Sequence, residues 1–222
     1  MTKLTQLTVL LLSFVTFRTE ATTLYQQTFA DDNSYTSQND TQSGGLGSFS
    51  KVFDNFTLTS SSQISDVHWI GAYYPEAGST DIGSPVVSGF LIEFWSDALG
   101  EPGSLLFSES ISGNADETFL NAGLYNQIFY SYDADLTSNF LALAGTQYWL
   151  SIQAQLAYPP HWGWATGNGP DSASYQDYLD QRYFNENDQA FSLTGTSVPE
   201  PSTILLLGIA SCGLLLRKRK LV

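Results

Sequence analysis

Apolar and polar residues alternate with a period of two through much of the chain, and this pattern limits the fold more than any other feature. Within residues 89–95, Phe90, Ile92 and Phe94 occupy one face of an extended segment and Glu93 the other. Residues 67–74 are largely apolar on both faces, which is typical of a central strand. Further strands are predicted at residues 24–29, 53–59, 104–111, 124–132, 147–154 and 189–193.

Turn sequences rich in glycine and proline separate these segments, and no amphipathic helical pattern exceeds two turns. Many short strands joined by turns predict an all-β fold. We expect a single antiparallel β-sandwich of about eight strands, either jelly-roll or immunoglobulin-like. Residues 31–50, which are mostly small and polar, are predicted to form a surface loop or a poorly ordered segment.

The C-terminal end of the chain combines three features of a membrane tail. A Pro-Glu-Pro motif precedes an uncharged, mostly apolar run at residues 202–216, and four cations follow it: Arg217, Lys218, Arg219 and Lys220. As a helix, these 15 residues would span roughly 22 Å, which is short for a hydrocarbon core of about 30 Å. A short span suits a segment that is recognised and then removed. The alternatives are a permanent anchor in a locally thinned bilayer and a buried core helix.

The motif Val198-Pro199-Glu200-Pro201, the apolar run and the basic end together resemble the PEP-CTERM sorting signal of Gram-negative bacteria. The same kind of tail also carries the label of an ice-binding protein C-terminal domain, which implies no ice binding here. The resemblance implies secretion, with recognition and cleavage by the membrane protease exosortase after a transient stay in the inner membrane. It also implies a final location at the cell surface or in the extracellular matrix, because this sorting system accompanies exopolysaccharide production.

The N-terminal end predicts export through the Sec translocon. Lys3 precedes a mainly apolar stretch at residues 4–17, and a cleavage site between small residues ends at Ala21. The charges of Arg18 and Glu20 beside this site leave an uncleaved anchor as an alternative. The predicted organisation is a signal peptide at 1–21, an ectodomain at 22–197 and a sorting tail at 198–222.

The ectodomain is strongly acidic. Residues 22–198 hold 20 acidic and only two basic residues, Lys51 and Arg182, which gives a formal charge of −18. Such a surface repels phosphate groups, so nucleic acids and direct adsorption to anionic lipid are disfavoured. The single cysteine, Cys212, lies in the tail, where it is either a small apolar residue or a lipidation site. The exported domain therefore contains no disulfide bond.

Four short segments of the ectodomain resemble a β-sandwich domain that recurs in PEP-CTERM proteins: residues 53–58, 145–152, 162–165 and 190–195. This resemblance implies a β-sandwich and no particular activity. In those proteins the first of these segments often carries two adjacent aspartates. Here Asp54 is followed by Asn55, which weakens the idea of a paired-carboxylate site at this point.

The residue types favour a structural or adhesive role without catalysis. The ectodomain has two histidines, His68 and His161, and lacks the common nucleophile, metalloprotease and phosphate-binding motifs. A glycoside hydrolase is the third hypothesis, because it needs only two carboxylates, and Glu93 among aromatic residues is its candidate. The more ordinary interpretations are a solvated strand carboxylate for Glu93 and a hydrogen-bonded strand residue for His68.

Carbohydrate binding, with exopolysaccharide as the ligand, is the second hypothesis. Tyr158, Trp162 and Trp164 lie in a segment with two prolines and a glycine, which would present an aromatic face to a sugar ring. The polar residues available to its hydroxyl groups are Asn168, Asp171 and Gln176. The competing interpretation places both tryptophans in the hydrophobic core.

No motif in the chain requires a cofactor. Two pairs of aspartates, Asp31 with Asp32 and Asp133 with Asp135, are candidates for a structural Ca²⁺ site, because they place oxygen donors in or beside predicted loops. Neither pair reproduces an EF-hand, and solvated loop carboxylates are the alternative.

Overall fold

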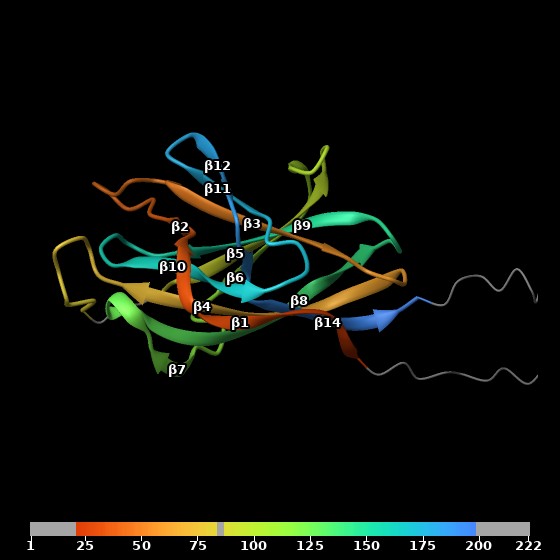
Figure 1. The fold of residues 1–222 in the computed structure, drawn as a ribbon, viewed down its shortest axis with the longest axis horizontal. Coiled ribbons are helices and arrows are strands. Elements are labelled where there is room, and N and C mark those ends of the chain that lie inside the picture. The colour runs from red at the N-terminus through yellow and green to blue at the C-terminus, as the bar shows by residue number, and fades with distance from the viewer. Residues whose placement is uncertain (1–20, 84–86, 199–222) are drawn as a thin grey trace, which may run out of the picture.

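The computed structural model describes residues 21–83 and 87–198, which form two β-sheets packed face to face (Figure 1). Each sheet has seven strands. Sheet A runs in the order β13 (Asp188–Gln189), β10 (His161–Asn168), β1 (Thr22–Thr36), β14 (Phe191–Ser197), β4 (Ser62–Tyr74), β8 (Ile128–Ala142) and β7 (Thr118–Ala122). Sheet B runs β12 (Gln181–Asn185), β11 (Ser174–Tyr178), β3 (Ser50–Thr57), β9 (Gln147–Gln155), β5 (Gly89–Asp97) and β6 (Pro102–Ser112), and β2 (Gln38–Asn39) joins β9 in parallel.

The prediction of an all-β fold with antiparallel sheets is confirmed. The described residues contain no α-helix and one short 3₁₀ turn, η1 (Leu124–Asn126). Two details differ from the predicted strands. Strand β1 continues to Thr36, through part of the predicted loop, because its last residues pair with β10. Strand β8 begins only at Ile128, after η1.

The predicted signal peptide and sorting tail lie outside the described residues, apart from Ala21 and Val198. Within the described part of the chain, no helix has the length and apolar character needed to span a membrane.

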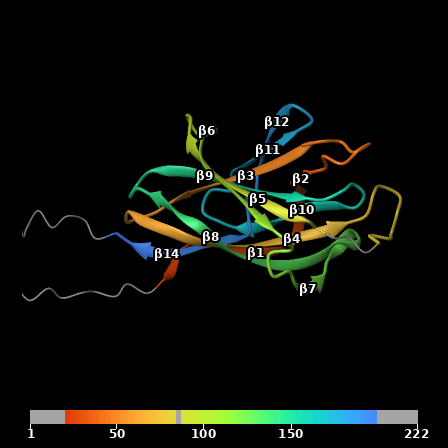
Figure 2. The same cartoon turned by 180° about the vertical axis from the view of Figure 1, so that it is seen from behind.

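Strands β14 and β10 share one position between β1 and β4 in sheet A. In Figure 2, β14 lies toward one end of the sandwich and β10 toward the other. Strand β14 pairs with residues 22–27 of β1 and 62–69 of β4, and β10 pairs with the remainder of both strands. Where the two meet, Trp164 Nε1 and Ile70 N both donate hydrogen bonds to the carbonyl oxygen of Ala190, at 3.0 and 3.2 Å. Segments far apart in the sequence are therefore joined in the centre of one sheet.

Aromatic rings fill the space between the sheets. Trp69 and Tyr132 of sheet A stack at 5.4 Å, and Phe90 of sheet B meets each of them nearly edge-on at 5.0 Å. Trp162 joins this group through a hydrogen bond of 3.1 Å from its Nε1 to Tyr132 Oη. Such rings bury large apolar areas, so this group contributes strongly to the stability of a domain that has no disulfide bond.

Gly71 allows the Trp162 ring to lie directly against strand β4. A Cβ at this position would overlap the Trp162 ring, which is fully buried and has little room to move. We therefore expect Gly71→Ala to lower the free energy of unfolding by about 1–3 kcal/mol, the usual range for overpacking a core. Urea denaturation measures this change. An unchanged midpoint would mean that the ring can shift without loss.

A buried carboxylate connects the two sheets near one edge. Asp54 of β3 is fully buried and accepts hydrogen bonds from the backbone N–H groups of Asn55 and of Gln189 on β13. Asp188, the neighbour of Gln189, accepts bonds from the backbone N–H groups of Ser172 and Ala173 at 3.1 Å each. The two carboxylates thus position the loop between β10 and β11 against β3.

Candidate functional site

The outer face of sheet B carries a groove of about 520 Å³. Strand alternation assembles one wall, because Phe53 of β3 and Glu93 of β5 both lie opposite Ser151 of β9 and so share a face with it. Lys51 and Trp95 occupy the same face, two residues along their strands. The hairpin of β11 and β12 forms the other wall. The residues that line the groove are Ser48, Phe49, Lys51, Phe53, Trp95, Asp177, Leu179, Asp180, Gln181 and Arg182.

Lys51 is held within this groove by an ion pair and an aromatic ring. Its Nζ lies 2.6 Å from Glu93 Oε2 and 5.6 Å from the centre of the Trp95 ring. The Trp95 ring meets Phe53 edge-on at 5.6 Å. Trp95 Nε1 is buried and has no hydrogen-bond partner within the described part of the chain. The ring of this wall that is partly exposed is Trp95, because Phe53 is only 1% exposed. The wall therefore combines the Trp95 ring with Lys51, which is paired with the buried Glu93.

Arg182 is the second cation of the groove. Its Nε and one Nη donate to the two oxygens of Asp177 at 2.7 and 2.9 Å, and its guanidinium lies 5.4 Å from the centre of the Phe53 ring. The hydrogen bond to Asp177 raises the pKa of Arg182 further, although partial burial opposes this, so the side chain stays charged. Both basic residues of the acidic ectodomain thus lie in one groove, and each has a carboxylate partner.

The β11–β12 hairpin also exposes aromatic side chains. Tyr178, Tyr183 and Phe184 are 38%, 45% and 55% exposed. The hairpin lies at the top of Figure 1, and its turn is anchored by a hydrogen bond from Leu179 N to Phe49 O. Exposed rings beside a groove are typical of a binding surface, because contact with a ligand removes apolar area from water.

The structure corrects the predicted sugar-binding segment. Trp162 and Trp164 lie on β10 rather than in a loop, and both are 0% exposed. Their indole N–H groups already donate to acceptors inside the domain. Neither ring can stack on a sugar. Tyr158, which precedes β10, is partly exposed and packs edge-on against Phe49 at 6.1 Å, but it does not line the groove.

The two aspartate pairs predicted to bind Ca²⁺ are both on strands, but only one pair has side chains within the described residues. Asp31 and Asp32 belong to strand β1, and their side chains lie outside the described residues. Asp133 and Asp135 lie on strand β8 rather than in a loop, and they do face other polar side chains.

Asp133 forms a second polar cluster with Asp66 and His68 of β4. His68 Nε2 lies 3.0 Å from Asp66 Oδ2, and His68 Nδ1 contacts Asp133 Oδ2. Within the described ranges, these three residues form the one group of His, Asp and Glu side chains whose donor atoms all lie within 4.8 Å of one another. His68 is therefore a candidate metal ligand. The strand pattern alone predicts only an ordinary hydrogen bond for it.

The pKa shifts in this cluster agree with its geometry. The hydrogen bond to Asp66 raises the pKa of His68 above its ordinary value, and nearby carboxylates add to this effect. Burial would raise the pKa of Asp66, but its hydrogen bond to His68 and the charge of that ring outweigh burial and lower it. Burial, followed by repulsion from Asp66, raises the pKa of Asp133. The histidine thus supplies the positive charge that two close carboxylates require.

The period-two pattern does not predict Lys51, Phe53, Trp95 and Arg182 as members of one site. One available signal is that Lys51 and Arg182 are the two basic residues among 20 acidic ones in the ectodomain. The pattern does not say which strands are neighbours, so it could not bring β3, β5 and the β11–β12 hairpin together.

Two family models match the chain. One, described as Domain of unknown function (DUF7901), matches residues 24–202, and the other, described as PEP-CTERM protein-sorting motif, matches residues 197–220. The second match confirms the PEP-CTERM resemblance of the tail, which implies recognition by exosortase and export to the cell envelope. No curated protein and no solved structure matches the chain.

Proposed function

The chain belongs to the family described as Domain of unknown function (DUF7901), and we propose that it is a non-catalytic adhesive protein of the extracellular matrix that holds polysaccharide in the groove on sheet B. The observation that carries this proposal is the groove itself. It combines the partly exposed Trp95 ring with both cations of an otherwise acidic ectodomain, beside the exposed rings of the β11–β12 hairpin. Aromatic faces flanked by a few polar groups are what a sugar ring and its hydroxyls require.

The charge of the groove favours neutral or weakly charged sugars. Lys51 is paired with Glu93 and Arg182 with Asp177, so the charges of these pairs cancel while their hydrogen-bonding atoms remain in place. A highly charged polyanion would gain little from these paired cations and would be repelled by the rest of the ectodomain. Hydroxyl-rich chains are therefore the favoured ligand.

The position of the groove supports an adhesive role. Thr22 pairs with Gly195, and β14 ends at Ser197, so the chain enters and leaves the domain at the same end of the sandwich (Figure 1). The Leu179–Asp180 turn lies at the Ser50 end of β3, whereas the Thr57 end of β3 leads to Ser61, whose carbonyl oxygen accepts a hydrogen bond from Val198 N. A domain held by its tail would present this turn away from the membrane.

The ion pairs in the groove favour binding over hydrolysis. A glycoside hydrolase needs two carboxyl groups that act as acid and as base or nucleophile across the scissile bond. Here Glu93 and Asp177 are each engaged by a cation. We therefore propose no catalytic activity. The absence of reducing-sugar release from a bound polysaccharide would support this view, and release that is lost in Glu93→Gln would contradict it.

Removal of the Trp95 ring is expected to weaken polysaccharide binding by at least about 30-fold, because aromatic hot spots typically contribute about 2 kcal/mol or more. Affinity electrophoresis of the full-length chain in gels that contain the host's own exopolysaccharide measures the effect of Trp95→Ala. Hydroxyethyl cellulose serves as a neutral comparison and alginate as an acidic one. We expect less retardation by alginate than by the neutral polymer.

Tyr158→Ala is the matched control, because this ring is also partly exposed but lies outside the groove. It should leave retardation unchanged, and circular dichroism should show both variants folded. The proposal fails if exopolysaccharide does not retard the wild-type chain. It also fails if Tyr158→Ala abolishes retardation while Trp95→Ala does not.

A further inference from the structure

Strands β4 and β8 place a histidine between two carboxylates on the outer face of sheet A. His68 lies directly opposite Asp133 in the β4–β8 ladder, and Asp66 precedes His68 by two residues. Residues two apart on a strand, and residues opposite each other across a ladder, point to the same face. Register alone therefore gathers the three side chains.

This cluster has little positive charge to balance it. Asp135 lies opposite Asp66 in the same ladder, and Asp116 lines the same cavity as His68 and Asp133. Both basic residues of the ectodomain lie far from these carboxylates, in the groove on the outer face of sheet B. The imidazole of His68 is thus the local counter-charge for several carboxylates.

One oxygen of the cluster is buried and unsatisfied. Thr194 Oγ1 and the His68 ring both bind Asp66 Oδ2, each at 3.0 Å. Asp66 Oδ1 is buried and has no hydrogen-bond partner of good geometry within the described part of the chain, although the nearby backbone N–H of Val67 helps to lower the pKa of Asp66. A buried carboxylate oxygen without a partner costs free energy, and a bound cation would remove that cost.

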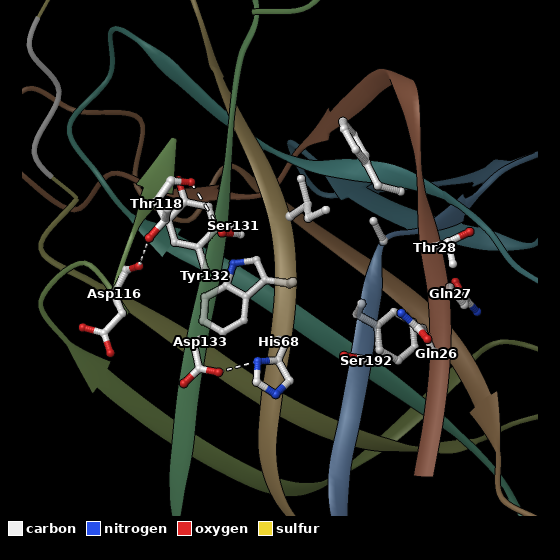
Figure 3. Close-up of a pocket in the computed structure, with 15 residues that line it drawn as sticks. Gln26, Gln27, Thr28, His68, Asp116, Thr118, Ser131, Tyr132, Asp133 and Ser192 are labelled. Atoms are coloured by element: carbon white, nitrogen blue, oxygen red, sulfur yellow. Dashed lines mark hydrogen bonds and ion pairs between the residues drawn. The ribbon is translucent and has the colours of Figure 1, made fainter. Parts of the chain in front are cut away.

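A cavity of about 470 Å³ adjoins the cluster. Figure 3 shows Asp133 directed toward His68, with Asp116 on one side and Ser192 and Gln26 on the other. The cavity offers a path for an ion and room for the water molecules that complete its coordination.

From these observations we propose that Asp66, His68 and Asp133 form a site for one divalent transition-metal ion, in which one ring nitrogen of His68 and one carboxylate are ligands and the other carboxylate orients the ring. An imidazole nitrogen combined with carboxylate oxygens suits Zn²⁺, Co²⁺, Ni²⁺ or Mn²⁺. Ca²⁺ and Mg²⁺ prefer ligand sets made of oxygen alone. The site therefore includes Asp133, one of the aspartates predicted to bind Ca²⁺, but its histidine favours a different class of metal.

The two ring nitrogens of His68 have different roles in this site. The ion replaces the proton on one nitrogen, and that proton is released to solvent. The other nitrogen keeps its N–H and donates it to the remaining carboxylate, which fixes the orientation of the ring. Because a carboxylate faces each nitrogen, the cluster provides both a ligand and an orienting partner for the ring.

Isothermal titration of the full-length chain with ZnCl₂ tests the proposal. The chain should carry no polyhistidine tag, because a tag binds Zn²⁺ itself, and it should first be stripped with a chelator in detergent. We expect one equivalent of Zn²⁺ per chain, and visible absorption on addition of Co²⁺. His68→Gln should weaken binding by about 100-fold or more, and Asp133→Asn by about 10–100-fold.

His161→Gln is the matched control, because it removes the other histidine of the ectodomain, which lies at the start of β10. It should bind Zn²⁺ like the wild type. His68 is partly exposed, so His68→Gln should fold, and circular dichroism checks this. The proposal is overturned if the wild type takes up no Zn²⁺, or if wild type and His68→Gln bind it equally. Ca²⁺ binding as tight as Zn²⁺ binding would also overturn it. Trp95→Ala should bind Zn²⁺ normally, which separates this site from the groove.

Discussion

Replacement of Trp162 by alanine is expected to lower the free energy of unfolding by about 3–5 kcal/mol, as is usual for large aromatic residues in a core. The side chain is 0% exposed, and its ring meets Phe90 at 5.2 Å and Tyr132 at 5.9 Å. The substitution opens a cavity between the sheets and removes the hydrogen bond from Trp162 Nε1 to Tyr132 Oη. Urea denaturation followed by far-ultraviolet circular dichroism measures the loss without relying on tryptophan emission.

Phe119→Ala is the control for this prediction, because the Phe119 ring is 59% exposed on the edge strand β7. We expect it to change the free energy of unfolding by less than about 1 kcal/mol. A Trp162→Ala protein as stable as the wild type would contradict the core position of this ring. The expected loss also means that Trp162→Ala cannot test sugar binding, since an unfolded domain binds nothing specifically.

The buried carboxyl groups Asp54 and Asp188 are expected to make the domain more stable as the pH falls toward their ordinary pKa near 3.8. Burial raises the pKa of Asp54 well above its usual value; the backbone N–H bonds from Gln189 and Asn55 oppose the shift, and the charges of Asp188 and Asp171 reinforce it. Burial and the hydrogen bond to Asp171 also raise the pKa of Asp188. A group whose pKa is raised by folding binds its proton more tightly in the folded state. Its stabilising contribution is complete below the ordinary value near 3.8 and is lost as the pH rises through the folded pKa.

Each such group changes the free energy of unfolding by up to about 1.4 kcal/mol per pH unit within its window. His161 acts in the opposite direction. Burial lowers its pKa, so its contribution to the free energy of unfolding is lost as the pH falls below 6.5. Urea denaturation at pH 8, 6.5 and 5 measures the net slope. Asp54→Asn cannot titrate, so it should flatten that slope whatever its absolute stability.

Asp180→Asn removes an exposed carboxylate and should retain the wild-type slope. The prediction is wrong if the wild type is no more stable at pH 5 than at pH 8. It is also wrong if Asp54→Asn and the wild type respond equally to pH, because Asp54 would then not titrate in this range.

Strands with strict alternation were predictable in type and position. Residues 89–95 and 147–154 correspond to β5 and β9, which are central in sheet B. Two segments were predicted as loops but are strands, because pairing with distant strands decides their conformation and their local composition does not. The polar C-terminal part of β1 is extended because residues 34–36 pair with residues 163–165 of β10. Two prolines suggested a loop around Trp162, but the strand begins immediately after them, at His161.

The candidate sites were predictable only in part. Asp133 was a predicted metal ligand, but its partners Asp66 and His68 are more than 60 positions away in the sequence and meet it through the β4–β8 register. The groove depends on the packing of three segments around Lys51 and Trp95, and no local pattern connects them. The composition singles out Lys51 and Arg182, because they are the two cations of the ectodomain. It does not show that these residues lie close together in the folded domain.

By itself, the sequence determined the all-β class, the acidic character of the ectodomain and the exosortase-sorted tail. These properties follow from local periodicity, composition and a short motif, all of which are encoded in adjacent residues. Only the tertiary structure decided that Trp162 and Trp164 lie in the core, that Asp54 is buried between the sheets and that His68 lies between two carboxylates. The physical reason is that strand order and register arise from packing between distant segments. A slip of one residue would turn every one of these side chains to the opposite face.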